Sequence, residues 1–366
     1  MSIRFDKDSR KATNGPMIFF SDPSAEISLG EEIRGAIESR LSFYAYRRPG
    51  DLMISFGSSE GVTEGIGEPG FVIAPFYPDA PYLTIPYRQV RTHGYNSGSS
   101  YRCPSASTTR EEHQAEIRRI QEVLKKNGTG KIIATRISVE NKRVDVGATF
   151  AELSRSHPDA FVFCFSTPVS GCWIGASPEL LLESGHHGLS TMALAGTREA
   201  GHHGDWDIKN VEEQQMVTAF ISETLLHNGI DPLIGDTFSK RAGKVEHLCT
   251  PVSGKPDIPL SADSLTSLLR DLSPTPALCG MPRDLALGII KETENFSRGY
   301  YGGFCGPYRS PSDFSFYVNL RCCLVEDTRY CIYTGGGITL LSDAESEWNE
   351  TEFKSFTMRD GIRFEN

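Results

Sequence analysis

The stretch YTGGGITLLSDAESEWNETEFKSFTM, residues 333–358, joins a strand-like run to a long helix through three consecutive glycines. Residues 342–345 (SDAE) have the spacing of a capping box, which predicts that the helix begins there. Glu347, Glu350 and Lys354 follow at i, i+3 and i+7 and therefore share one face of this helix. Two carboxylates and an ammonium beside a glycine turn are suited to a divalent cation and an anionic substrate. An exposed helix with an ordinary Glu–Lys pair is the alternative interpretation.

A second helix-like segment, residues 209–226, also places a carboxylate on an apolar face. Helical periodicity puts Glu213 in the middle of the apolar stripe and Glu212 at its edge. A carboxylate that points into a core must be paired, protonated or bound to a metal. Glu213 and Glu350 together are therefore a candidate Mg2+ site, because this hard cation takes few protein carboxylates plus water and substrate oxygens. A buried pair with Lys or Arg remains the alternative.

Composition limits the class of protein. The 366 residues are enough for one large domain or two, and the formal net charge is −10. There is no basic stripe, so we expect no nucleic-acid partner. The charged N-terminus predicts no signal peptide, and no apolar run approaches the roughly eighteen residues of a membrane span. Nine cysteines without a C-x-x-C pair are typical of reduced thiols, and together these features predict a cytoplasmic protein.

Short strands bounded by turn residues outnumber long helices along the chain. A helix is predicted at residues 111–126, followed by a stop at Asn127-Gly128. Residues 79–109, rich in Tyr, Pro, Ser and Gly, predict an irregular connector. This pattern predicts an α+β protein dominated by antiparallel sheet. The expected strands are residues 52–56, 71–75, 131–136, 161–165, 171–176, 179–182, 316–325 and 330–334.

Several motifs carry less information than they first suggest. Residues 65–70 (GIGEPG) match G-x-G-x-x-G, but an apolar strand follows where a dinucleotide site needs a helix, so they predict a plain turn. The histidine pairs at 186–187 and 202–203 lie in Gly- and Asp-rich segments without further metal-ligand spacing, and exposed loops explain them better than zinc. No G-x-S-x-G elbow supports a serine hydrolase.

Nine segments in a fixed order carry a family resemblance: residues 131–136, 174–182, 193–198, 209–217, 245–248, 272–282, 298–303, 319–321 and the stretch quoted first. They resemble the chorismate-utilising enzymes, which include isochorismate, salicylate, anthranilate and aminodeoxychorismate synthases. The resemblance implies a single large α+β domain of two mainly antiparallel sheets, with helices packed outside and a Mg2+-dependent site between the sheets. Residues 111–366 would form the chorismate-binding catalytic region. Residues 1–110 would be a weakly matched, β-rich part of the same fold.

Three positions distinguish the members of this family. Anthranilate-type enzymes carry glutamine where Lys131 stands, and aminodeoxychorismate synthases carry a nucleophilic lysine where Ala195 stands. Lys131 with Ala195 therefore implies water as the nucleophile and no glutaminase partner. Salicylate synthases tend to have threonine at Ala277, so the resemblance implies an isochorismate synthase acting on chorismate. Salicylate synthase is the nearest alternative; an aminating enzyme or a relative without turnover is more remote.

The resemblance also implies roles for individual residues. Lys131 would be the base that activates water for attack at C2, and Glu179 the acid that protonates the hydroxyl leaving C4. Glu213 and Glu350 would ligate Mg2+, with Glu347 supporting through water. Asn210 and Gln214 depart from the family pattern at positions behind the metal ligands. Both menaquinone and siderophore biosynthesis begin with this reaction, and the sequence favours neither. The implied substrate-binding residues are Thr197, His247, Ala277, Tyr301, Arg321, Gly335, Gly336, Gly337 and Lys354.

Overall fold

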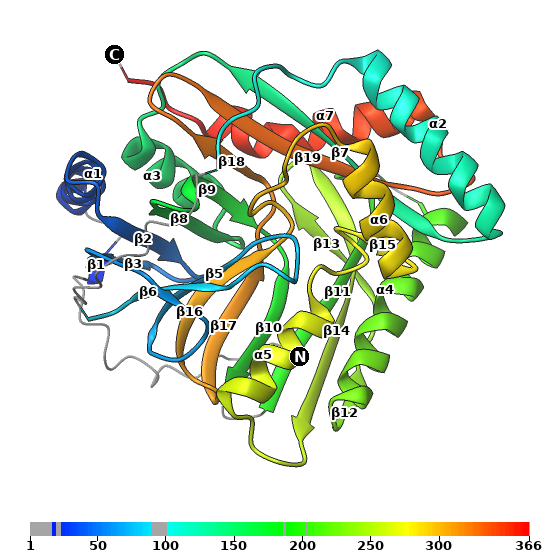
Figure 1. Ribbon diagram of the computed structural model, residues 1–366, viewed down its shortest axis with the longest axis horizontal. Coiled ribbons are helices and arrows are strands. Elements are labelled where there is room, and N and C mark those ends of the chain that lie inside the picture. The colour runs from blue at the N-terminus through cyan, green and yellow to red at the C-terminus, as the bar shows by residue number, and fades with distance from the viewer. Residues whose placement is uncertain (1–16, 20–22, 89–100, 186–187, 203, 366) are drawn as a thin grey trace.

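Two antiparallel sheets form the centre of the molecule, and helices cover their outer faces (Figure 1). The computed structural model describes residues 17–19, 23–88, 101–185, 188–202 and 204–365. Strands from the first 110 residues belong to both sheets, so the N-terminal part and the remainder build one fold. The predicted α+β class with two mainly antiparallel sheets is confirmed.

Among the described residues, the first sheet has nine strands, and the C-terminal hairpin lies inside it, two strands from one edge. That hairpin lies beside the strand that begins at Lys131, with Gly337 opposite Ile133. The order across the sheet is β1 (Met17–Phe19), β3 (Met53–Ser59), β2 (Ser42–Arg47), β8 (Phe161–Thr167), β9 (Gly171–Ser177), β18 (Cys322–Val325), β19 (Tyr330–Ile338), β7 (Lys131–Glu140) and β15 (Gly280–Met281).

The second sheet has ten strands in the described part of the chain, and its long strand β14 pairs with three of the others. The order is β12 (Ile230–Ile234), β14 (Val245–Pro256), β11 (Gly188–Glu199), β10 (Leu180–Gly185), β17 (Asp313–Val318), β16 (Phe304–Ser310), β5 (Gly70–Ala74), β6 (Leu83–Pro86) and β4 (Thr63–Glu64). Strand β13 (Phe238–Ala242) also pairs with β14.

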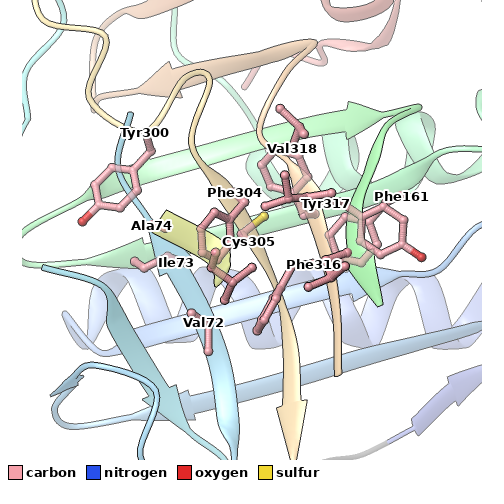
Figure 2. Close-up of a cluster of buried hydrophobic side chains, with 14 of the residues drawn as sticks. Val72, Ile73, Ala74, Phe161, Tyr300, Phe304, Cys305, Phe316, Tyr317 and Val318 are labelled. Atoms are coloured by element: carbon pink, nitrogen blue, oxygen red, sulfur yellow. The ribbon is translucent and has the colours of Figure 1, made fainter. Parts of the chain in front are cut away.

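Aromatic side chains fill the space between the sheets. Phe161 of β8 stacks on Tyr317 of β17 with ring centroids 4.1 Å apart, which joins one sheet to the other (Figure 2). Phe304 and Phe316 lie in the same buried cluster. Offset aromatic pairs stabilise such a core beyond the area they bury. This packing fixes the position of one sheet relative to the other.

Local sequence signals explain where the helices begin and end. Helix α2 (Arg110–Asn127) has a capping box between Thr109 and Glu112, and Gly128 ends it in the left-handed conformation, as predicted. Helix α7 (Ala344–Gly361) is capped by Asp343, which accepts from Ser346, so the expected start at residues 342–345 is one residue early. The other helices are α1 (Pro23–Glu38), α3 (Val146–Ser156), α4 (Ile208–His227), α5 (Ala262–Leu272) and α6 (Arg283–Thr293).

Two expectations from the sequence are wrong. Residues 316–325 are not one strand: β17 ends at Val318 and β18 begins at Cys322 in the other sheet, with Arg321 at φ 51° between them. Asn319 and Arg321 interrupt the apolar residues here, but two polar residues spaced two apart also fit one continuous strand, so the sequence does not mark the crossing point. The irregular connector at 79–109 contains strand β6, while residues 89–100 lie outside the described part of the chain.

The simpler expectations agree with the structure. Residues 65–70 connect β4 to β5 as a turn without a following helix. All nine cysteines are free thiols. His202 is exposed, whereas His186, His187 and His203 lie outside the described residues. Within the described part, no helix is both long and apolar enough to cross a membrane.

Candidate active site

A cavity lies where β11, β14 and β19 meet helices α4 and α7. Nine of the predicted site residues line it: Glu179, Thr197, Glu213, His247, Ala277, Tyr301, Arg321, Gly335 and Lys354. Its volume of about 70 Å³ holds only a few water molecules. A ring-sized ligand therefore requires the side chains around the cavity to move.

Lys131 lies directly behind the cavity wall. It is the first residue of β7, only 1% exposed, and its Nζ donates to Glu213 Oε1. A Cβ on Gly337 would come within 2.4 Å of Lys131 Cε and 3.2 Å of Glu213 Oε1. Real Cβ atoms do not approach so closely, so the bare glycine makes room for this pair. Gly337 thus has a steric role here, which differs from the amide contact expected for the glycine turn.

The three glycines are not a turn in the structure. They continue strand β19, and the strand ends only at Ile338. Gly335 accepts a hydrogen bond from Lys354 Nζ at 2.9 Å through its carbonyl oxygen. A Cβ on Gly336 would lie 3.0 Å from Glu347 Oε2. The glycines therefore leave space for the charged side chains of α4 and α7 beside the strand.

Glu179 is the buried acid of the site. It follows Pro178 in the short link between β9 and β10 and is 3% exposed. Burial raises its pKa to about 8, and the cations of Lys240 and Lys131 oppose this rise. A carboxyl with such a pKa carries its proton near neutral pH. It is therefore able to donate that proton to a group in the cavity.

Each carboxylate expected to bind metal is paired with a lysine. Besides Lys131–Glu213, Lys209 donates to Glu347 at 2.6 Å and Lys354 contacts Glu350 at 2.6 Å. The pKa of Lys209 is raised, because three glutamates, Glu347, Glu350 and Glu213, outweigh the effect of its burial. All three carboxylates therefore act on one ammonium, and α4 and α7 bring them to the same side of the cavity.

The site also carries a buried guanidinium. Arg321 lines the cavity, donates from Nη1 to Lys354 O at 3.1 Å, and has Nη2 3.1 Å from His247 Nε2. Burial and, to a smaller extent, the positive charges of Arg321 and Lys354 lower the pKa of His247 to about 3, so the ring is neutral. His247 Nδ1 lies 2.8 Å from Gly196 O and donates to it, which leaves Nε2 to accept from Arg321. Burial lowers the pKa of Arg321 to about 10, which keeps it charged at neutral pH and available to an anion.

Comparison with known proteins identifies the family. Residues 88–363 match the family model described as chorismate binding enzyme. The chain belongs to the chorismate-binding enzymes. It is 32% identical to the Escherichia coli isochorismate synthase EntC over 231 residues, which are 59% of this chain and 57% of that protein. It is 31% identical to the isochorismate synthase MenF of the same bacterium over 236 residues, 61% of this chain and 53% of MenF. The matched region thus spans about half the length of these relatives.

Solved structures share the fold of this chorismate-binding enzyme. The menaquinone-specific isochorismate synthase MenF of E. coli superposes with a TM-score of 0.73 at 19% identity, covering 88% of this chain and 89% of that chain. A Bacillus anthracis protein assigned as the isochorismate synthase DhbC gives 0.74 at 21% identity, covering 91% and 99%. Anthranilate synthase component I of Streptococcus pneumoniae gives 0.61 at 15% identity, covering 86% and 89%.

The centre of the buried face of α4 lies one residue away from the position predicted from the sequence. Glu213 was expected there, but Gln214 occupies that place at 2% exposure, while the Glu213 side chain is 14% exposed at the cavity. Gln214 Oε1 accepts from Ala195 N at 2.8 Å, and its amide donates to Ala193 O at 3.0 Å. Asn210 Oδ1 accepts from Thr197 N at 2.9 Å. Asn210 and Gln214, which depart from the family pattern, therefore hydrogen-bond α4 to β11.

Two lysines that contact candidate site residues, or the peptide beside them, were not predicted from the sequence. Lys209 pairs with Glu347, and Lys240 donates to Pro178 O beside Glu179. Lys209 stands one turn before Glu213 on the same helix, so its position was a usable signal. Lys240 lies on a short strand without any motif, and nothing in the sequence connects it with residue 179.

The carboxylates have oxygen donors that suit a metal, but they do not converge on one point. Among the described residues, no three His, Cys, Asp or Glu side chains converge closely enough to hold a metal as they stand. Nevertheless, Glu347 Oε2 is buried and has no hydrogen-bond partner among those residues, next to bare Gly336. Hard carboxylate oxygens with one unsatisfied atom suit Mg2+. The residues therefore fit the cation once their lysines are displaced.

Proposed function

We propose that this chorismate-binding enzyme is an isochorismate synthase, a Mg2+-dependent isomerase that converts chorismate to isochorismate. The observation that carries the proposal is the pair Lys131 and Glu179. Both are buried: Glu179 lines the cavity with a pKa of about 8, and Lys131 lies behind the wall, bonded to Glu213 of the lining. Relatives named isochorismate synthase, at 31–32% identity, support the same activity.

The reaction exchanges one hydroxyl position for another. Lys131 accepts a proton from water as its oxygen bonds to C2, the ring double bonds shift, and the C4–O bond breaks. Glu179 donates its proton to the departing oxygen, which leaves as water. One water is added and one is released, so the product is an isomer of the substrate. Lys131 must be neutral to act as a base, and its bond to Glu213 has to be released for this step.

The remaining residues bind and orient the substrate in this proposal. Arg321 and Tyr301 hold the enolpyruvyl carboxylate, since a guanidinium in a buried site favours a planar anion. Lys354 and the backbone near Gly335–Gly337 contact the ring carboxylate. Thr197, His247 and Ala277 complete the wall around the ring.

Mg2+ is the cofactor that we infer. Glu213 and Glu350 would hold it, with Glu347 supporting through water. When bound, the cation would offset the charge of the ring carboxylate and act as a Lewis acid.

The proposal extends to the setting of the reaction. Every residue given a role lies between Lys131 and Lys354, which supports residues 111–366 as the catalytic region and residues 1–110 as strands that complete both sheets. We propose a cytoplasmic enzyme that works without a glutaminase subunit, since Lys131 serves water chemistry. Its product would enter menaquinone or siderophore biosynthesis.

Product analysis tests the activity. The full chain is incubated with chorismate and Mg2+, and the products are identified by NMR, with a chelator-treated sample as control. Isochorismate is the expected product. Salicylate with pyruvate would assign the enzyme to the salicylate synthases, and an aminated product that forms only with ammonium would assign it to the anthranilate-type enzymes. Unchanged chorismate in the presence of Mg2+ would refute the proposal.

A further inference from the structure

Lys240 anchors the peptide that carries the proposed acid. It lies in β13, opposite His247 of β14, and is half-buried. Its Nζ donates to Pro178 O at 2.8 Å and lies 3.6 Å from Met192 Sδ. Pro178 lines the cavity and immediately precedes Glu179. Lys240 is thus fixed to the main chain of the acid from outside the cavity, whose lining does not include it.

The same ammonium also acts on the carboxyl of Glu179. Burial is the strongest influence on Glu179, and Lys240 is the cation that opposes it most. The other groups that face this carboxyl are Lys131 of β7, Lys354 of α7 and the hydroxyl of Thr275. A neighbouring cation favours the ionised form of an acid.

Lys240 itself has several neighbours with opposing effects. Burial lowers its pKa, whereas Cys249 of β14, Glu179 and Asp159 raise it. Asp159 lies in the link between α3 and β8. Lys240 therefore has Glu179 and Asp159 as acidic neighbours, and its hydrogen bond to Pro178 O fixes it beside Glu179.

We propose that Lys240 is a positioning residue for Glu179, fixing the Pro178 peptide and keeping the buried carboxyl able to release its proton. The inference rests on the proposed function, in which Glu179 is the general acid. A buried carboxyl without a nearby cation holds its proton too tightly to donate it near neutral pH. A cation that contacts the main chain, rather than the carboxyl, tunes the acid without occupying the cavity.

Two substitutions separate the two parts of this role. Lys240→Gln keeps a hydrogen-bond donor for Pro178 O but removes the charge, and Lys240→Met removes both. In both variants, the fall of kcat at alkaline pH should move upward by about one pH unit or more, because Glu179 ionises less readily. Both variants should lose kcat near neutral pH, because Glu179 holds its proton more tightly, and Lys240→Met should lose several-fold more than Lys240→Gln, because Pro178 O also loses its donor. The charge-matched control is Lys255→Gln, which removes an exposed lysine on the neighbouring strand β14. This variant should keep the wild-type pH profile.

A second readout keeps this test independent of turnover. The infrared band of the protonated Glu179 carboxyl, identified by its loss in Glu179→Gln, should titrate at higher pH in Lys240→Gln than in the wild type. An unmoved band and an unmoved alkaline limb would overturn the role of Lys240, even when the wild type makes isochorismate. A wild type that makes no isochorismate would refute the proposed function, while the shift of the band would still decide whether Lys240 tunes Glu179.

Discussion

Replacing Glu179 by glutamine should stabilise the protein at alkaline pH while it removes activity. In the folded state, burial raises the pKa of Glu179 to about 8 from the ordinary 4.5. A carboxyl of this kind contributes its full stability below about pH 4.5 and loses it as the pH rises through about 8. The difference of about 3.5 pH units corresponds to about 5 kcal/mol at most, at about 1.36 kcal/mol per unit. Glutamine resembles the protonated acid and lacks this penalty.

The assay is urea unfolding of both proteins between pH 5 and pH 9. The free-energy difference between Glu179→Gln and the wild type should widen by about 3–4 kcal/mol over this range, most of it below pH 8. In parallel, kcat should fall by about 10²-fold or more, because the variant has no proton to donate. The exposed Glu122→Gln is the control, and its difference from the wild type should not change with pH. A pH-independent difference for Glu179→Gln would contradict the buried, protonated acid.

Three further predictions concern the base, the cation and the glycines. Lys131→Gln should lower isochorismate formation by about 10²-fold or more, and concentrated ammonium should partly restore turnover to an aminated product; unchanged isochorismate formation would exclude Lys131 as the base. Glu350→Ala should stay inactive at Mg2+ concentrations that saturate the wild type. The control Glu345→Ala, on the exposed side of α7, should give the wild-type dependence of activity on Mg2+ concentration. Identical activity curves for the two variants would remove Glu350 from the metal site. Gly337→Ala should lower kcat at least about 10-fold, because its Cβ would lie 2.4 Å from Lys131 Cε. The control is Gly35→Ala, where a Cβ meets open space, and it should leave kcat unchanged. Wild-type kcat in Gly337→Ala would contradict the steric role.

Much of the site was predictable because its parts are local in sequence. The order of the nine segments gave the family, and nine of the residues implied by it line one cavity, among them Glu179, His247 and Arg321. Helix α2 followed the sequence closely, because caps and terminal glycines act within one or two turns of the residues they stop. The antiparallel α+β class followed from short strands with frequent turns.

Other features depended on contacts between distant segments. The Gly-rich stretch 333–338 looks like a turn, yet it is a strand because β7 pairs with it along its whole length. Residues 316–325 divide between the two sheets, although the polar residues Asn319 and Arg321 at the crossing point also fit a single alternating strand. Strand pairing depends on residues far apart in the chain, so an alternating pattern in the sequence does not determine which sheet a strand joins.

The sequence by itself therefore determined the family and the antiparallel class, and it supplied the candidate residues of the site. Only the tertiary structure decided how those groups are charged and paired. It buried Glu179 so that it keeps a proton, and it joined each candidate metal carboxylate to a lysine. Lys240 joined the site through a contact across 62 residues of chain. The reason is physical: periodicity and capping are set by neighbours in the chain, whereas desolvation and charge pairing are set by whatever the fold brings close.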